Sequence, residues 1–532
     1  MAGTDTTDGE ADTPTEANGD HETVDVCVVG SGIAGCAAAL AAAREGADVL
    51  VLTKAEKPAD ASTDWAQGGI STTRGEPETL EADILEASDG TADPHAVDVL
   101  VSEADDAVSD VLVDTLGVEF DRDDDGEFEY TREAAHSTFR ILHVDASTGS
   151  HILRPFLNYV DDHDRIEVRQ DTAALELIAH EGKVHGVLSD EAVDEGGTPI
   201  YAGSTVLATG GIGSLYTRST NPPGSTGDGV AMAALAGADV GDLEYVQFHP
   251  TAFAGTEDDV PGERSNVFLL SEALRGEGAI LRNGDGERFM PDYHEKAELG
   301  PRDVVARAVE AERERTGEVV LDVSTLDEPF EEQYPDLAAK VRERGVEGDE
   351  IPVAPCEHFL CGGIAVDDRG RTTLDGLYAV GECSRTGVHG ANRLASTSLL
   401  EGLVWGLRAG EDAAEQVDGG REPEVVEAPD LLTRDPDLPP RFAAEKFTRL
   451  RRTMDSSLGL ERDPDEIARA GGVLRRLKGE VDAYTRTRTS RDLYELRNAC
   501  VTALLIARAA RENTESVGCH HVVDSSAASA TR

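Results

Sequence analysis

The stretch "TVDVCVVGSGIAGCAAALAAAREGADVLVLTK" (residues 23–54) constrains the fold of this chain more than any other. A valine-rich run precedes Gly30, Gly32 and Gly35, and an alanine-rich segment and a second valine-rich run follow them. This order predicts strand, tight turn, helix and strand, a unit that holds the pyrophosphate of a dinucleotide at the helix N-terminus. A threonine and Lys54 stand where NAD-binding proteins carry the acidic residue that binds the ribose, which argues against NAD.

Two later segments indicate that the dinucleotide is FAD. "STVLATGGIG" (204–213) is an apolar run ending in glycines, and "TLDGLYAVGECS" (373–384) is another, ending at Glu382. The three segments in this order resemble those of flavoproteins with two dinucleotide-binding domains. The resemblance implies that Glu382 hydrogen-bonds the ribityl chain of FAD. Lys54 either meets a phosphate or the flavin edge, or is a solvated loop lysine.

The charge balance is extreme, with 105 Asp and Glu against 48 Lys and Arg and a formal net charge of −57. The acidic residues are spread along the chain, which favours a surface adapted to very high salt over an acidic partner-binding face. Nucleic acid is excluded as a partner because phosphate recognition needs a basic surface. At molar salt the Debye length falls to about 3 Å, so an anionic substrate would still be able to approach.

Length and segment composition give the remaining limits. A chain of 532 residues is expected to form two to four domains, and no apolar run approaches the length of a membrane helix. Residues 1–23 are polar and acidic, which predicts a disordered tail and a cytoplasmic protein. The seven cysteines lack zinc-site spacing, so we expect buried thiols and no metal.

One arginine lies where the sequence predicts a buried segment. In "HGANRLASTSLLEG" (389–402), Arg393 is surrounded by Gly, Ala, Ser and Leu. Burying an unpaired guanidinium is prohibitive, so Arg393 needs an anionic partner. That partner is either a carboxylate of the protein or a ligand.

Seven segments, taken together, identify the chain as a member of the flavoprotein family of succinate dehydrogenase, fumarate reductase and L-aspartate oxidase. The resemblance covers about residues 24–460 and rests on long motifs in a fixed order. They are "STDWAQGGI" (62–70), "STGDGVAMAALAGA" (225–238), "EYVQFHPTA" (244–252), "LLSEALRGEGAIL" (269–281), "LGPRDVVARA" (299–308), "HFLCGGIAVDDRGRT" (358–372) and "HGANRLASTSLLEG" (389–402).

The resemblance implies a set of substrate-site residues. Arg393 would clamp one substrate carboxylate over the flavin, and His249, His358 and Ser271 would hold the carboxylates with it. Arg302 matches the arginine that donates or accepts a proton. Because a free guanidinium is a poor base, Arg302 would pass protons along a chain, with Glu272 as its neighbour.

The resemblance also implies the FAD contacts. Family members that attach FAD covalently have a histidine where this chain has Ser62, so FAD is expected to be non-covalent. The helix that begins at Ser398 and Leu399 would direct its N-terminal amides at the flavin pyrimidine. The expected FAD-binding residues are Gly30, Ser31, Gly32, Ile33, Ala34, Gly35, Lys54, Ser62, Thr63, Gln67, Gly68, Gly69, Ala174, Gly210, Asp228, Glu382, Ser398 and Leu399.

A further loop discriminates between members of the family. "YTREAAHSTFRILHVDASTG" (130–149) resembles the aspartate oxidase loop, and it places Glu133 where a carboxylate can pair with the ammonium group of a substrate. Succinate has no ammonium group and would leave that carboxylate unpaired. The other interpretation of Glu133 is a surface residue. Ala134 and Ala135 stand where the family has two glycines.

The expected activity is therefore FAD-dependent oxidation of L-aspartate to iminoaspartate, the first step of quinolinate and NAD biosynthesis. Oxygen, which would give hydrogen peroxide, or fumarate would accept the electrons, and quinolinate synthase is a candidate partner. The alternatives are a soluble fumarate reductase or succinate dehydrogenase flavoprotein subunit, and a flavin-binding scaffold that has lost catalysis.

The expected fold is an α/β, Rossmann-like FAD-binding domain interrupted by an α+β capping domain and followed by a C-terminal helical domain. The FAD-binding domain takes residues 24–242 and 359–420, and the capping domain that carries the substrate site takes 243–358. A proline- and acid-rich linker (421–440) leads to the helical domain (441–515), and 516–532 are expected to be a disordered tail in which His520 and His521 have no role.

Overall fold

The structure is a computed structural model, and it describes residues 21–144, 147–192, 197–254, 265–417, 422–429 and 441–523. The strands are β1 Glu22–Val29, β2 Val49–Leu52, β3 Ile70–Ser71, β4 Tyr130–Thr131, β5 Ile141–Leu142, β6 Ile166–Arg169, β7 Ala174–His180, β8 Lys183–Ser189, β9 Thr198–Leu207, β10 Arg218–Ser219, β11 Val240–Gly241, β12 Val246–Phe253, β13 Ser265–Asn266, β14 Ile280–Asn283, β15 Val319–Asp322, β16 Glu350–Leu360, β17 Gly363–Ala365, β18 Leu377–Ala379 and β19 Ser384–Arg385. The helices are α1 Ile33–Arg44, α2 Pro77–Ala87, α3 Pro94–Ala107, α4 Thr148–Asp161, α5 Asp228–Ala236, α6 Glu272–Gly276, α7 Met290–Tyr293, α8 Arg302–Thr316, α9 Phe330–Gln333, α10 Pro335–Glu343, α11 Ser398–Glu415, α12 Phe442–Ser457, α13 Pro464–Thr485 and α14 Arg491–Glu512.

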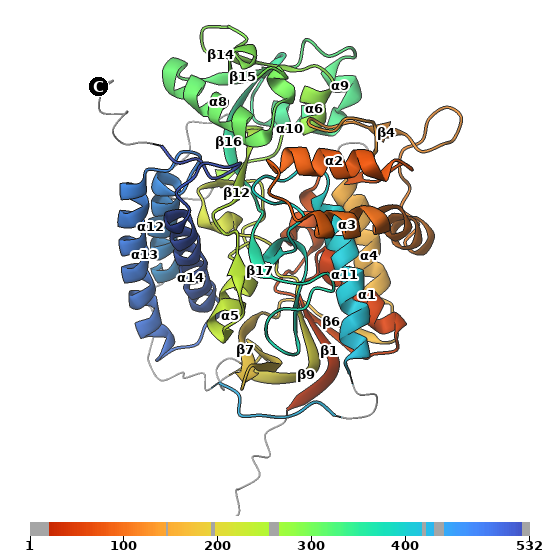
Figure 1. Ribbon diagram of the computed structural model, residues 1–532, viewed down its shortest axis with the longest axis vertical. Coiled ribbons are helices and arrows are strands. Elements are labelled where there is room, and N and C mark those ends of the chain that lie inside the picture. Colours follow the sequence, from red (N-terminus) through yellow and green to blue (C-terminus); the bar gives the residue numbers. More distant parts are fainter. Residues whose placement is uncertain are drawn as a thin grey trace, which may run out of the picture.

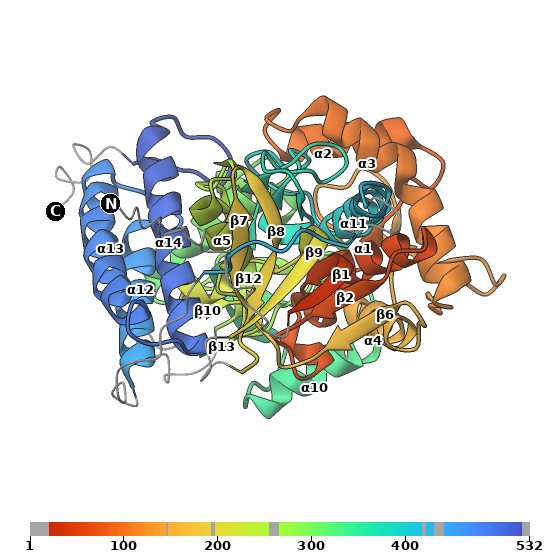
Figure 2. The ribbon, with the colours of Figure 1, turned by 90° about the horizontal axis from the view of Figure 1, so that it is seen from below.

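The central sheet has the strand order β6-β2-β1-β9-β8-β7, and β18 also pairs with β9 (Figure 2). The strands β6, β2, β1, β9 and β18 are parallel, whereas β7 and β8 form an antiparallel edge. Both faces of β1 are buried: Val26 and Val28 belong to one core, Cys27 and Val29 to the other. A continuous apolar strand is what a sheet covered on both faces requires.

Helices α1 and α11 lie side by side over one face of this sheet (Figure 1). They approach closely because α1 is rich in alanine and α11 carries glycine at every fourth position, at residues 402, 406 and 410. A Cβ atom on Gly406 would lie 2.6 Å from the carbonyl oxygen of Ala34, and one on Gly410 would lie 2.1 Å from that of Ala38. The small residues therefore bring the N-terminus of α11 next to the glycine turn after β1.

A second unit stands above the sheet in the view of Figure 1 and is built around the long strands β12 and β16, which pair antiparallel. It contains β14, β15 and helices α6 to α10, and it has a hydrophobic core of its own that includes Leu270, Leu281, Val309, Leu321 and Leu337. The strands β12 and β16 carry His249 and His358 down to the central sheet. This unit corresponds to the predicted capping domain, whose precise boundaries stay predictions.

Helices α12, α13 and α14 form a bundle at the left of Figures 1 and 2. The bundle packs through α14 against α5 and β7, and its buried leucines share a core with the second face of the central sheet. Among the described residues, no helix is long and apolar enough to span a membrane. The predicted fold class, a Rossmann-like domain with an inserted α+β unit and a helical domain, is confirmed.

The ends of the chain differ from the prediction. Strand β1 already begins at Glu22, inside the segment 1–23 that was expected to be a disordered tail. Residues 516–523, expected to be disordered, pack against the body of the protein: Val523 N donates to Arg462 O at 3.1 Å, and His520 is fully buried. The prediction of disorder is therefore wrong for residues 516–523, and His520, which was expected to have no role, accepts a hydrogen bond from Arg462. All seven cysteines, in contrast, are buried thiols outside any disulfide, as predicted.

Candidate functional site

A cavity of about 640 Å³ lies where the carboxyl ends of the parallel strands meet the second unit and the helical bundle. Gly30, directly after β1, forms its floor with φ +113°, and a Cβ atom there would lie 2.1 Å from the carbonyl oxygen of Ala208. Only glycine fits a position with both a positive φ and so close a neighbour. All the predicted FAD-binding residues except Gly35 line the cavity.

Gly35 lies behind the cavity wall, where a Cβ atom would come 2.0 Å from the carbonyl oxygen of Gly30. It therefore lets α1 begin directly under the turn, so that the helix N-terminus points at the cavity. Gly32 caps this helix without a side-chain hydrogen bond.

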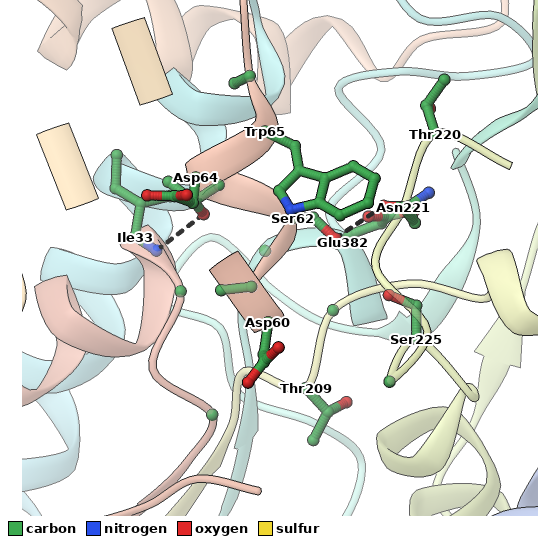
Figure 3. Close-up of a pocket in the computed structure, with 18 of the residues that line it drawn as sticks. Ile33, Asp60, Ser62, Asp64, Trp65, Thr209, Thr220, Asn221, Ser225 and Glu382 are labelled. Carbon is green, nitrogen blue, oxygen red and sulfur yellow. Dashed lines mark hydrogen bonds between the residues drawn. The ribbon is translucent and has the colours of Figure 1, made fainter. Parts of the chain in front are cut away.

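The segment around residues 58–69 covers the same end of the cavity (Figure 3). Thr63 Oγ1 accepts a hydrogen bond from Ile33 N at 3.2 Å, and Ser62 Oγ donates to Asn221 Oδ1 at 2.7 Å. Trp65 and Asp60 also face this opening in Figure 3, although no motif of the sequence analysis pointed to them.

Glu382 lines the cavity from the short turn after β18, as Figure 3 shows. Its Oε1 accepts a hydrogen bond from Leu360 N at 3.0 Å. Burial raises the pKa of Glu382 to about 8, and repulsion by Glu357 adds to the shift.

Lys54 is neither a solvated loop residue nor free to meet an anion. Its ammonium group donates to Asp228 Oδ2 at 2.6 Å and to Glu495 Oε1 at 2.9 Å. Burial alone would lower the pKa of Lys54, but these two carboxylates raise it. Glu495 belongs to α14, so the helical bundle supplies part of the cavity wall, which the sequence did not predict.

Arg393 lies at the other end of the cavity, buried and without a protein carboxylate as a hydrogen-bond partner among the described residues. One terminal nitrogen donates to His358 Nε2 at 2.9 Å, and the guanidinium carbon lies 4.0 Å from the centre of the Phe359 ring. Burial, with repulsion by Arg302 second, lowers the pKa of Arg393 to about 10. Of the two partners that the sequence analysis left open, a carboxylate of the protein is not found among the described residues, and a ligand stays the prediction.

His249 and His358 face each other, with ring centres 5.2 Å apart. Burial is the main cause that holds the pKa of His249 at about 3 and that of His358 well below its usual range. Thr251 N donates to His249 Nδ1 at 3.2 Å, which leaves Nε2 as the protonated nitrogen of a neutral ring. His249 lies just behind the cavity wall rather than in it.

Arg302, Glu272 and Arg275 form a buried chain of charges. Arg302 Nε donates to Glu272 Oε2 at 2.5 Å, and Arg275 NH2 donates to Glu272 Oε1 at 2.5 Å. Burial alone would raise the pKa of Glu272, but the two arginines hold it well below its usual range. The prediction paired Arg302 with Glu272 and missed Arg275, although a glutamate and an arginine three residues apart at a helix start were a usable signal.

Gln247 connects the two arginines of the site, and sequence reasoning missed it too. Its Oε1 accepts from Arg302 NH1 at 3.0 Å. Its amide nitrogen donates to the carbonyl oxygen of Arg393 at 2.9 Å and to Asn392 Oδ1 at 2.8 Å. The relative position of Arg302 and Arg393 is therefore fixed by one fully buried side chain.

Glu133 is buried at the same end of the cavity and is not a surface residue. Its Oε2 accepts a hydrogen bond from Ser396 Oγ at 2.6 Å. Burial, with repulsion by Glu272 second, raises the pKa of Glu133. Ala135, two residues on, has φ +68°, a conformation that glycine adopts more easily, which explains the glycine found there in the family.

The remaining predicted residues also lie around this end. Ser271 caps α6, with its Oγ accepting from Ala273 N at 3.3 Å, and it lines the cavity. Ser398 and Leu399 begin α11 and line the cavity as well. The structure thus brings together the predicted substrate residues from β12, β16, α6, α8 and the loop before α11.

The cavity fits FAD on three observations. The glycine turn and the N-terminus of α1 offer backbone N–H groups to a pyrophosphate. The buried Gln67 Oε1 has no hydrogen-bond partner among the described residues, and it lines the same cavity. Glu382 offers a carboxyl group to a sugar-like chain between the two ends.

Comparison with known proteins agrees with this geometry. Residues 25–399 match the model of the FAD binding domain family. The chain is 67% identical over 515 residues to the L-aspartate oxidase of Halobacterium salinarum, covering 96% of this chain and 98% of that protein. It is 41% identical over 522 residues to the L-aspartate oxidase of Streptomyces coelicolor, covering 93% and 88%.

Solved structures show the same architecture. A variant of the E. coli quinol fumarate reductase chain FrdA superposes with a TM-score of 0.84 at 28% identity, covering 94% of this chain and 91% of that chain. Mycobacterium smegmatis Sdh1 superposes with a TM-score of 0.78 at 30% identity, covering 94% and 89%. The cofactor of the cavity is FAD, and the chain belongs to the L-aspartate oxidase family.

Proposed function

We propose that this protein oxidises L-aspartate to iminoaspartate with non-covalent FAD. The observation that carries the proposal is the pairing of charges at one end of the cavity. Arg393 and Arg302 lie in its wall without filling it, and the buried carboxyl group of Glu133 faces the same space. A ligand that binds the two arginines needs two carboxylates, and a ligand that binds Glu133 needs an ammonium group.

Arg393 is the main carboxylate ligand in this proposal. Its fork of N–H donors suits a bidentate contact, and Phe359 supports it from one side. His358 and Ser271 line the space next to it. His249 lies behind the cavity wall, where its Nε2 is 3.7 Å from Glu272 Oε2. These groups hold the substrate Cα at a fixed position, which is most of what a two-substrate site contributes to rate.

Glu133 selects the amino group. Its carboxyl group is buried with Ser396 Oγ as a hydrogen-bond donor, and burial raises its pKa, which supports an ammonium group of the substrate as the stabilising partner. The same raised pKa suits Glu133 to accept the proton that the amino group must lose. A dicarboxylate without an amino group leaves Glu133 unsatisfied and is disfavoured.

Arg302, Glu272 and Arg275 provide a proton route between the cavity and the interior of the capping unit. A guanidinium group does not lose a proton readily, so each arginine in this chain releases one proton only as it receives another. When bound, FAD supplies the two-electron chemistry, taking hydride from Cα and returning electrons to oxygen or to fumarate. Ser62 stands where covalent attachment would need a histidine, so FAD is held by contacts alone.

Three further assignments belong to the proposal. Quinolinate synthase would take up the unstable iminoaspartate. A cytoplasmic location is supported by seven buried thiols outside any disulfide. A surface adapted to molar salt is supported by the net charge of −57 and by the similarity to a Halobacterium salinarum protein.

Mixing the purified protein anaerobically with L-aspartate or with succinate in molar KCl tests the activity. We expect L-aspartate to bleach the visible flavin band and to yield oxaloacetate and ammonia after hydrolysis of the imine, and we expect succinate to leave the flavin oxidised. Bleaching by succinate alone would contradict the proposal and would favour a succinate-oxidising or fumarate-reducing enzyme.

A further inference from the structure

The segment Val517–Val523, which follows the last helix, lies against the loop that carries Arg393. In Figure 1 the chain after α14 runs from the top of the helical bundle toward β12 and β16. Cys519 N donates to the carbonyl oxygen of Ala391 at 2.9 Å, and Cys519 Sγ donates to Asn392 Oδ1 at 3.3 Å. Both contacts are within two residues of Arg393.

The same segment supports the Arg393 side chain from behind. Phe359, whose ring lies under the guanidinium of Arg393, belongs to a small cluster with Tyr245, Cys361 and Ala391. Val517 packs against this cluster. The loop and the ring that together orient Arg393 therefore share one support.

The segment is anchored at its other end by a fully buried arginine of the helical domain. Arg462 NH1 donates to His520 Nδ1 at 2.8 Å and to the carbonyl oxygen of Glu244 at 2.6 Å. Its backbone pairs with the segment, since Arg462 N donates to His521 O at 2.9 Å. Burial lowers the pKa of His520 to about 4, so the ring is neutral and its Nδ1 is free to accept from Arg462.

A contact to the capping unit completes the junction. Arg307, on α8, donates to the carbonyl oxygen of Gly518 at 3.3 Å and to Asp303 at 2.8 Å. Asp303 in turn accepts from Asn392 Nδ2 at 2.9 Å. Helix α8 begins with Arg302, so both arginines of the substrate site are tied to one segment.

We propose that Val517–Val523 is a positioning element for dicarboxylate binding, through which Arg462 and His520 of the helical end of the chain hold Arg393 and the start of α8 in register. None of the residues in this segment lines the cavity, so it acts through Arg393. This inference rests on the proposed function, because it assigns Arg393 to a substrate carboxylate.

Gly518 offers the sharpest test. It has φ +50°, and a Cβ atom there would lie 2.5 Å from the carbonyl oxygen of Ala391, so Gly518→Ala forces the segment off the Arg393 loop. Gly471→Ala is the matched control, because a Cβ atom at Gly471, on α13, meets nothing within 4 Å. Both are made in the full chain and purified with FAD.

For Gly518→Ala we expect the Kd for succinate, taken from the shift of the flavin spectrum, and the KM for L-aspartate to rise at least about 10-fold. The Kd for FAD should stay within about 2-fold, as for Gly471→Ala, whereas the Tm should fall because of the positive φ and the close backbone contact at Gly518. An unchanged succinate Kd, in a series whose wild type is bleached by L-aspartate, would overturn the inference and leave the function intact. Failure of the wild type to be bleached would instead overturn the function.

A double-mutant cycle shows whether the effect passes through Arg393. In an Arg393→Lys background we expect Gly518→Ala to change the succinate Kd by less than about 2-fold, because the group that it displaces is already compromised. A full effect in that background would contradict a positioning role. His520→Asn, whose side-chain oxygen can replace Nδ1 as the acceptor for Arg462, should retain binding, and His520→Leu should lose it. Equal losses in the two would also count against the proposal.

Discussion

The two ends of the cavity are formed by different kinds of residue. At the FAD end the decisive features are backbone positions and small side chains, such as Gly30, Gly35 and Ser62. At the substrate end they are buried ionisable groups, such as Arg393 and Glu133. We infer that shape specifies the cofactor, whereas unsatisfied charge specifies the substrate.

The largest expected effect is on substrate affinity, with FAD binding unchanged. Arg393→Leu removes the buried cation that pairs with a substrate carboxylate, which costs about 3–5 kcal/mol of binding. We expect the KM for L-aspartate to rise by about two to three and a half orders of magnitude while the protein stays yellow. Steady-state kinetics and the visible spectrum check both, and near-normal aspartate affinity would rule out the clamp.

A clash at the FAD end should have the opposite pattern. Gly30→Ala places a Cβ atom against the carbonyl oxygen of Ala208, and we expect loss of FAD with about 2 kcal/mol or more of lost stability. Gly46→Ala is the control, because Gly46 also has a positive φ (+93°) but its Cβ would meet nothing within 4 Å. Flavin absorbance after gel filtration measures how much FAD each variant retains. Equal loss of FAD in the two variants would show that the positive φ, rather than the close contact, makes glycine necessary at residue 30.

Glu382 should make the stability of the FAD-free protein depend on pH. Its folded-state pKa is about 8, against about 4.3 in an unfolded chain, so between these values the folded state holds a proton that the unfolded state has released. Stability then falls as pH rises through this window, by up to about 1.4 kcal/mol per pH unit. Urea unfolding at several pH values should show the slope in the wild type and a shallower one in Glu382→Gln. If the free energy of unfolding depended on pH equally in both proteins, groups other than Glu382 would cause the dependence.

The smallest effect concerns the loop that carries Glu133. Ala135→Gly relieves the strain of φ +68° and should stabilise the protein, by no more than about 1 kcal/mol. Ala134→Gly, at a neighbouring position without a positive φ, should instead destabilise it. Thermal unfolding of the two variants compares them, and a loss of stability in Ala135→Gly would show that the backbone is not strained there.

The glycine turn was predictable, because the steric needs of a phosphate-binding turn are met by residues within a few positions of one another, and all the expected FAD-binding residues but Gly35 line the cavity. The matched motifs also pointed to Arg393, Glu133 and His358, which line the cavity, and to His249, which lies behind its wall. The roles of these residues toward FAD and substrate stay predictions. The sequence did not predict that Lys54 meets Glu495, or that Gln247 joins Arg302 to Arg393, because such pairs depend on segments brought together only by the fold. The ordered segment around His520 was missed because its sequence departs from the family pattern, and its backbone contacts form only in the folded chain.

The central claim is that Glu133 recognises the substrate ammonium group. The most direct test compares the Kd for D-aspartate, an amino dicarboxylate used as the unreactive ligand, with the Kd for succinate. Both are measured anaerobically by flavin spectroscopy in the wild type and in Glu133→Gln. We predict that Glu133→Gln weakens the amino ligand by about 10-fold or more and leaves succinate unchanged or tighter, since a neutral amide removes both the ion pair and the unpaired buried charge. Equal weakening of both ligands would contradict the account.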